Sequence, residues 1–159
     1  MPNDLINTDP LVSHNFFLEV DGSVMTMLSG VSGLDAEVEV VTTTQVGPKG
    51  QMQTIKTLGT QTKAPDLSLT RMAPPDSTKD KLWGWFNDVR DKGMKVGARE
   101  SARKNGSIVL YDASNSEVSR FNFFNAWPSK ISTDGLSADS NDIVKETITL
   151  VCERLERVK

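Results

Sequence analysis

The sequence predicts a mainly β fold with one flanking α-helix. Three observations support this: short segments alternate apolar and polar side chains, turns containing Gly or Asn separate them, and one segment places apolar residues at helical spacing. The chain has 159 residues, of which 37% are hydrophobic and 25% charged, which is the size and composition of one folded domain. We therefore expect a single domain over residues 1–159, with residues 1–13 as a flexible N-terminal segment.

The first strands are expected to form a hairpin. Residues 15–20 and 24–28 are rich in large apolar side chains. The Asp21-Gly22 pair between them is a preferred two-residue turn. Residues 36–40 then alternate Ala and Val with Glu, the pattern of a half-buried strand.

A long connection follows this strand. Residues 44–62 are rich in Gly, Thr and Gln, and Gly47, Pro48 and Gly50 interrupt regular structure. Long connections in compact domains tend to be functional or disordered. We expect a long extended loop here.

One helix is expected between Lys79 and Lys92. The segment Ser77-Thr78-Lys79-Asp80 resembles a capping box in which Asp replaces the usual Glu or Gln. Gly93 supplies a C-terminal stop. An apolar stripe should pack on the sheet and leave Trp83 outside it; the stripe comprises Leu82, Trp85, Phe86 and Val89.

The remaining strands lie in the C-terminal half. Asn105-Gly106 opens residues 108–111, an apolar run typical of a strand buried on both faces. Residues 118–127 return, and their alternation places Phe121, Phe123 and Trp127 on one face, as core residues. Pro128 should end this strand because proline has no N–H for the ladder. A polar linker spans residues 129–142. The last segment fits either a helix or a strand, and its β-branched residues favour a strand.

Charge is unevenly distributed along the chain, whose net charge is −3. Between Lys92 and Lys104 there are five basic residues and one acidic residue, Glu100, but no aromatic residue. Nucleic-acid-binding domains show a stronger basic footprint with interleaved aromatics. We expect a solvated face here, with an electrostatic contact patch as the alternative.

The residues needed for catalysis are not grouped in this sequence. One histidine and one cysteine cannot supply a His/Cys zinc tetrad, and no glycine-rich phosphate loop follows a strand. Ser13 and His14 are adjacent, so on a strand they point to opposite faces and cannot form a nucleophile pair. Cys152 is expected to be a small buried apolar residue. We therefore expect no enzyme activity, no cofactor and no metal.

A family resemblance rests chiefly on one motif. Phe123-Phe124-Asn125-Ala126-Trp127-Pro128 resembles the F-x-N-A-W-P signature of the phage tail tube family, the inner-tube proteins of contractile-tailed phages and phage-derived contractile injection systems. Further similar segments follow the family's order and occupy residues 16–22, 31–39, 140–150 and 153–157. The resemblance extends over residues 14–158.

The resemblance implies a structural role. Such proteins have a β-barrel or sandwich fold with a flanking helix and form hexameric rings, which stack into a hollow conduit for cargo or DNA inside a contractile sheath. The implied partners are other copies of the chain, the sheath, baseplate or spike proteins and tube-terminating proteins. Cargo would pass without specific binding, and no membrane insertion is expected. Assembly would occur in the bacterial cytoplasm, without a signal peptide, into a phage tail or an injection particle released from the cell.

Two groups of residues are candidates for assembly. The loop residues Gly47, Pro48, Lys49, Gly50 and Gln51 are assigned to ring stacking, because a long arm suits contact with an adjacent ring. The strand residues Glu37, Glu39, Thr42 and Thr44 are assigned to the lumen or a subunit interface.

Two alternatives remain open. A paralogue that initiates the tube at the baseplate would form one ring without extending it. A small monomeric ligand-binding β-barrel would line its pocket with the aromatic residues. The size of the purified particle separates these hypotheses. Long tubes indicate the main tube subunit, single rings the initiator, and monomers the ligand-binding barrel.

Overall fold

The structure is a computed structural model that describes residues 15–93 and 102–159. The expected N-terminal segment 1–13, His14, and the middle of the basic stretch, including Lys95 and Arg99, lie outside these residues. In chain order the elements are β1 (Asn15–Val20), β2 (Ser23–Leu28), β3 (Gly30–Ser32), β4 (Glu37–Val46), β5 (Met52–Lys63), β6 (Leu67–Met72), α1 (Lys81–Lys92), β7 (Lys104–Tyr111), β8 (Glu117–Thr133), β9 (Lys145–Val151) and β10 (Arg154–Arg157).

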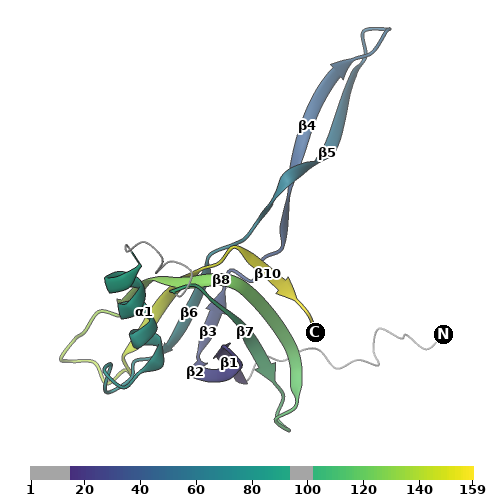
Figure 1. The fold of residues 1–159 in the computed structure, drawn as a ribbon. Coiled ribbons are helices and arrows are strands. Elements are labelled where there is room, and N and C mark those ends of the chain that lie inside the picture. The colour runs from purple at the N-terminus through teal and green to yellow at the C-terminus, as the bar shows by residue number, and fades with distance from the viewer. Residues whose placement is uncertain (1–14, 94–101) are drawn as a thin grey trace.

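The predicted mainly β fold with one flanking helix is confirmed (Figure 1). Seven strands form an antiparallel sheet in the order β2-β1-β7-β8-β9-β6-β3, and β10 adds to β8 as the eighth. Among the described strands no ladder closes this sheet into a barrel. Its edge strands β2 and β3 are nevertheless consecutive in the chain. Ser29 alone separates them, and its N–H donates to the carbonyl of Thr70 on β6 at 2.7 Å.

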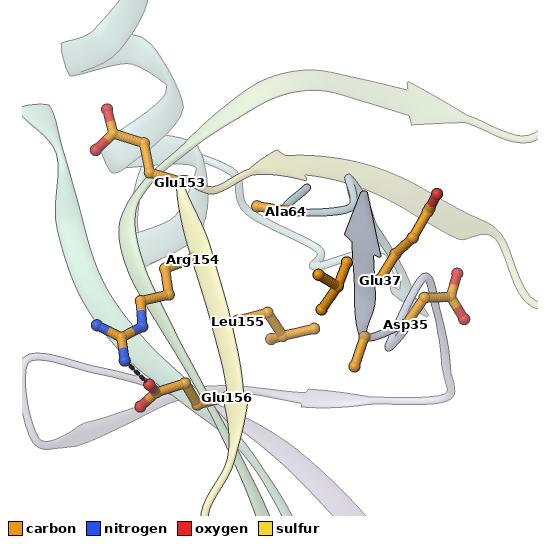
Figure 2. Close-up of a pocket in the computed structure, with 9 residues that line it drawn as sticks. Asp35, Glu37, Ala64, Glu153, Arg154, Leu155 and Glu156 are labelled. Atoms are coloured by element: carbon orange, nitrogen blue, oxygen red, sulfur yellow. Dashed lines mark hydrogen bonds and ion pairs between the residues drawn. The ribbon is translucent and has the colours of Figure 1, made fainter. Parts of the chain in front are cut away.

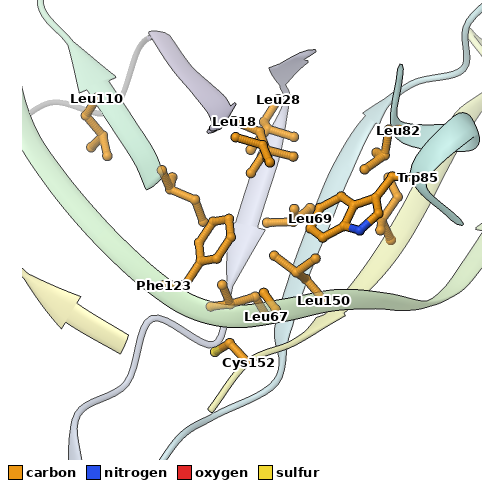
Figure 3. Packing of buried hydrophobic residues seen from close by; sticks show 14 residues of the cluster. Leu18, Leu28, Leu67, Leu69, Leu82, Trp85, Leu110, Phe123, Leu150 and Cys152 are labelled. Carbon is orange, nitrogen blue, oxygen red and sulfur yellow. The ribbon is translucent and has the colours of Figure 1, made fainter. Parts of the chain in front are cut away.

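Alternating side chains of the sheet fill the core together with one face of α1 (Figure 3). The apolar run predicted to be buried on both faces is confirmed, because Ile108 and Val109 have no exposed surface. From α1, Leu82 and Trp85 are buried and Val89 packs against the core, as predicted. Phe86, the fourth residue of the predicted stripe, is only half-buried and instead contacts Trp83 edge to face, with 5.9 Å between the ring centroids. The last segment is a strand, β9, as its β-branched residues indicated.

The helix begins two residues later than predicted. Its N-cap is Asp80, whose carboxylate accepts a hydrogen bond from the backbone N–H of Trp83 at 3.0 Å. Ser77 does not cap the helix. Residues 76–78 instead form their own turn, in which the Asp76 carboxylate accepts hydrogen bonds from the N–H and hydroxyl of Thr78.

A β-bulge at Asn125 changes which face each side chain of β8 occupies. The φ angle of Asn125 is +51°, and between Phe123 and Ala126 β8 holds one residue more than the facing segment of β7. Phe123 and Ala126 are therefore both buried, and Trp127 is only half-buried and outside the core. The prediction that Trp127 shares the core face with Phe123 is wrong, because simple alternation fails at a bulge.

Pro128 does not end β8, which continues to Thr133. A second shift in register lies between Pro128 and Lys130, where β8 pairs with β9. Bulges are positions at which a strand tolerates proline. The polar linker is correspondingly shorter than expected and occupies residues 134–144.

A buried charge network, which the sequence analysis missed, holds α1 on the sheet. Arg71 on β6 is 2% exposed, and its guanidinium donates to both carboxylate oxygens of Asp80 at 2.9 and 2.7 Å. It also donates to Glu146 on β9 at 3.2 and 3.3 Å. Glu146 in turn accepts a hydrogen bond from the indole N–H of Trp83 at 3.2 Å. The network therefore joins two strands to the first turn of the helix.

The sequence contains a signal for this network. Leu67, Leu69 and Arg71 alternate on one face of β6, and Glu146, Ile148 and Leu150 do the same on β9. Each strand thus turns one charge towards the core, and the register pairs Arg71 with Glu146. Buried charges occur in opposite-sign pairs. An inward-facing arginine on one strand therefore predicts an inward-facing carboxylate nearby, and Glu146 is the candidate that the sequence offers.

Candidate assembly surface

The expected long loop is instead a β-hairpin that projects from the sheet (Figure 1). β4 and β5 pair only with each other, as a separate two-stranded sheet. The ladder extends from Glu37 opposite Lys63 to Val46 opposite Met52. The prediction of an irregular loop is therefore wrong for most of residues 44–62. An isolated two-stranded hairpin is marginally stable in water, and no third described strand pairs with this one.

The five residues of the hairpin tip, assigned above to ring stacking, form a tight turn. They are Gly47, Pro48, Lys49, Gly50 and Gln51. The N–H of Gly47 donates to the carbonyl of Gln51 at 2.7 Å, and the N–H of Gly50 donates to the carbonyl of Gly47 at 3.0 Å. Gly50 has a φ of +75°, which a residue with a side chain adopts only with strain. The structure thus places all five residues together at the end of the arm.

The hairpin exposes apolar side chains on both of its faces. Val46 and Met52 are 69% and 76% exposed beside the tip, and Leu58 is 76% exposed nearer the base. Val41 and Ile55 are exposed on the opposite face. Exposed apolar side chains gathered on one element in this way are typical of interaction sites.

The four strand residues assigned to the lumen or interface do not share one face. Side chains alternate along a strand, so Glu37 and Glu39 lie on one face of β4 and Thr42 and Thr44 lie on the other. Thr42 faces Lys56 and Thr44 faces Thr54 across the ladder. The structure therefore divides this set into an acidic part at the base and a threonine part along the arm.

A bulge in β5 lies near the base of the arm. Val38 faces Thr62 and Val40 faces Leu58, so β5 contains two more residues than β4 over this interval. Gly59 lies against the side chain of Glu39, and a Cβ added at Gly59 would be 2.7 Å from the Cβ and Cγ of Glu39. Position 59 requires glycine because the side chain of Glu39 leaves no room for a Cβ there, and not because the backbone has an unusual φ.

A groove of about 440 Å³ lies where the hairpin meets the body (Figure 2). Its walls come from the start of β4 and from the segment containing β10. Its ionised side chains are those of Asp35, Glu37, Glu153, Arg154 and Glu156. Arg154 forms an ion pair with Glu156 on the same strand. The groove has four acidic side chains and one basic one beside apolar side chains such as Val38 and Leu155, and it lies beside the arm rather than in the domain interior.

The F-x-N-A-W-P residues have structural roles in this chain. The side-chain amide of Asn125 donates to Glu153 at 2.9 Å, and the backbone N–H of Asn125 donates to the side chain of Asn105 at 2.9 Å. Glu153 also pairs with Arg103, whose guanidinium lies 4.8 Å from the ring centroid of Trp127. Phe124 similarly lies beneath Arg154. The motif thus builds the bulge and anchors the segment that follows β9.

The described residues do not assemble a metal centre of His, Cys, Asp or Glu side chains. No group of three or more His, Cys, Asp or Glu side chains in residues 15–93 and 102–159 could hold a metal ion. Cys152 is buried, as predicted, and its thiol donates to the carbonyl of Pro65 at 3.4 Å. Burial, and then the charge of Asp66, raises the pKa of this thiol. It is therefore held in the neutral form, which is a poor nucleophile.

The described residues of the basic stretch have acidic neighbours. Lys92 pairs with Asp88 at 3.1 Å, and Lys104 lies 3.7 Å from Asp21. Arg103 pairs with Glu153 as described above. No helix within the described part of the chain has the length and apolar character needed to cross a membrane.

Comparison with known sequences identifies one family. The family model described as T4-like virus tail tube protein gp19 matches residues 12–156. No curated protein matches the chain.

Solved structures share the fold at low sequence identity. The extended-state sheath-tube complex of the PVC extracellular contractile injection system contains a chain with a TM-score of 0.73 and 22% identity, over 99% of this chain and 97% of that one. The sheath/tube terminator of the same system contains a chain with a TM-score of 0.74 and 23% identity, over 96% and 99%. The six-fold symmetrised baseplate of the anti-feeding prophage contains one with a TM-score of 0.70 and 19% identity, over 95% and 97%.

Proposed function

The chain belongs to the T4-like virus tail tube protein family, the tube subunits of phage tails and contractile injection systems, and on this premise we propose that it is the main subunit of such a tube. Copies of the chain form hexameric rings, and the rings stack head to tail into a hollow conduit inside a contractile sheath. The conduit is passive: cargo or DNA passes through it without specific binding.

The observation that carries this proposal is the exposed apolar hairpin. Burial of a large apolar side chain stabilises by about 1.5–3 kcal/mol, and the arm exposes several without a partner in its own chain. Val46, Met52 and Leu58 each have more than two thirds of their surface exposed. A neighbouring subunit that covers the arm gains this free energy, so the hairpin favours assembly over a monomer.

The tube's partners are inferred from the assemblies in which the same fold occurs. A sheath-tube complex, a sheath/tube terminator and a six-fold symmetrised baseplate contain chains of this fold. We infer that this chain likewise contacts a sheath, a terminator and a baseplate, and that six-fold symmetry sets the ring. Glu37, Glu39, Thr42 and Thr44 remain candidates for the lumen or for contacts between subunits.

The monomeric ligand-binding alternative receives no support from the aromatic residues that it would use. Phe123 has no exposed surface and packs inside the core. Phe121 packs against the same core, and Trp127 is covered by Arg103. Phe123 is thus part of the packed interior rather than of a pocket wall.

Shortening the hairpin tests the proposal. Replacement of residues 44–54 by Asn-Gly joins Thr43 to Ile55, which already face each other, through a preferred two-residue turn. The wild-type protein should form long tubes in negative-stain micrographs, whereas the shortened protein should melt at the same temperature and form single rings or monomers. Normal tubes from the shortened protein would show that the outer part of the hairpin is not needed for tube assembly. Wild-type single rings would indicate the initiator, and wild-type monomers the ligand-binding domain.

A further inference from the structure

The outward face of one half of the sheet carries two aligned rows of residues. β8, β9, β6 and β3 are neighbours in the sheet. Side chains alternate along a strand, and Val31, Leu69, Ile131 and Ile148 of these strands pack in the core, so the residues beside them point outward. The register aligns these outward residues into two rows that cross all four strands. One row is Ser32, Ser68, Thr149 and Lys130, and the other is Gly30, Thr70, Thr147 and Ser132.

We refer to these eight residues as the hydroxyl face. Six of them are serine or threonine, one is glycine and one is lysine, so Lys130 is the only charged residue in the two rows. None has a large apolar side chain. A hydroxyl group both donates and accepts hydrogen bonds, so it is satisfied by water. The face is therefore wetted, and it offers a passing molecule neither an apolar patch nor a carboxylate.

The other outward surfaces of the described chain are different in character. The outward face of β1 and β8 holds an ion pair in which Arg120 donates to Glu19 at 3.0 Å and to Glu117 at 2.7 Å. The hairpin exposes large apolar side chains, as described above. The solvent side of α1 and the strand β10 both carry charges of both signs; their exposed charged residues are Lys81, Asp88, Arg90, Asp91, Lys92, Arg154 and Arg157.

We propose that the hydroxyl face forms the inner wall of the tube. The inference rests on the proposed function, because only a closed ring has an inside. Every charge on the inner wall is repeated in each subunit of the ring, on a surface that curves towards itself. Repeated like charges repel one another and hold oppositely charged cargo, and exposed apolar patches bind other molecules. Of the surfaces compared above, the hydroxyl face has the least of both.

This assignment has a consequence for the cargo. Lys130 supplies one positive charge per subunit, and the wall has no fixed negative charge. An acidic cargo would therefore meet no like charge on the hydroxyl face as it passes. The strand residues Glu37, Glu39, Thr42 and Thr44 are then left as candidates for contacts between subunits.

Cysteine labelling with two reagents of different size tests the assignment. In a Cys152→Ser background, tubes of Lys130→Cys are treated with a small maleimide or with a maleimide carried on ferritin. The hole in a hexameric ring is about as wide as one subunit, and ferritin is far wider than a domain of 17.5 kDa, so it stays outside the tube. The control is Asp88→Cys, which puts a cysteine on the exposed face of α1.

We expect the small maleimide to modify both variants in tubes. The ferritin reagent should modify position 130 at least tenfold more slowly than position 88 in tubes, and both positions at similar rates in unassembled protein. Equal reaction of the ferritin reagent at the two positions in tubes would place the face outside and overturn the inference. Failure of the small maleimide to reach position 130 in tubes would place the face between subunits and overturn it equally.

A second variant covers the case in which Lys130→Cys does not assemble. Ser32→Cys lies in the same row, on the opposite edge strand, and is exposed. It should show the same difference between the two reagents. Absence of tubes from the wild-type protein would overturn the proposed function itself, whereas a wrong wall assignment leaves tubes intact and changes only the labelling. The two failures are therefore distinguishable.

Discussion

Replacement of Arg71 by methionine should strongly destabilise the domain. Methionine fills a similar volume but leaves Glu146, which is 5% exposed, and Asp80 without the guanidinium that neutralises them. The guanidinium makes five hydrogen bonds, all to Asp80, Glu146 and Thr26. Removal of one partner from a buried charge network costs about 3–5 kcal/mol. At roughly 2–4 °C per kcal/mol for a domain of this size, the melting temperature should fall by about 6–20 °C.

Urea unfolding followed by tryptophan fluorescence measures this change, at a protein concentration below that at which sedimentation detects rings. Arg90→Met is the matched control, because Arg90 is exposed and pairs with Asp91 on the helix surface. An exposed pair contributes about 0–1 kcal/mol. Arg71→Lys should fall between the two, since lysine keeps the charge but cannot bind both oxygens of Asp80 in a fork. A loss for Arg71→Met no larger than that for Arg90→Met would refute the view that this network anchors α1.

Four further measurements test the fold. Phe123→Ala should cost about 3–5 kcal/mol of unfolding free energy, and Trp127→Ala clearly less, because only Phe123 is fully buried; equal losses in thermal melts would contradict the bulge in β8. Asn125→Ala should cost roughly 1–2 kcal/mol and Asn125→Gly less, because Asn125 has a φ of +51°; the opposite order in urea titrations would exclude backbone strain as the cause. Gly59→Ala should lower the free energy of unfolding and reduce tube formation in micrographs, because the added Cβ would lie 2.7 Å from the Cβ and Cγ of Glu39; normal tubes and an unchanged urea midpoint would show that the bulge tolerates a side chain. Burial raises the pKa of Asp80, but the hydrogen bonds from Arg71 and Trp83 outweigh it and place the pKa below its ordinary value. The contribution of Asp80 to stability is therefore complete above the unfolded-state pKa of about 3.9 and is lost as the pH falls through the folded-state pKa; a urea midpoint that stayed constant from pH 5 to pH 2 would contradict this.

The hairpin shows why one part of the fold could not be predicted from alternation. A strand is recognised in a sequence when one face is buried and the other is solvated. β4 and β5 expose both faces within a single subunit, so Thr42 to Gln45 carry no apolar–polar period. Gly47 and Gly50 interrupt regular structure, as predicted, and lie in the turn of the hairpin. The segments on either side of that turn are strands rather than the expected loop. Under the proposed stacking, the contacts that stabilise this arm lie in another subunit.

The β8 strand illustrates a second limit. Alternation from Phe121 places Phe123 and Trp127 on one face. That inference holds only while each residue of β8 faces one residue of the neighbouring strand. One residue at a positive φ, Asn125, adds a step and reverses the facing of the residues that follow it, up to the second register shift between Pro128 and Lys130. Asparagine is one of the few residues with a side chain that tolerates this conformation, so its presence in the motif was the available signal.

The sequence by itself determined the elements whose pattern is local. Period-two segments became strands, the stripe on α1 became a buried helix face, and the F-x-N-A-W-P motif indicated the family that the comparison identified. Only the tertiary structure decided which inward charges meet, where a bulge reverses a face, and that the two strands beside the tip form an arm. The physical reason is sequence separation. Periodicity reflects neighbours a few residues apart, whereas Arg71 and Glu146 are 75 residues apart and meet only through the register of β6 and β9.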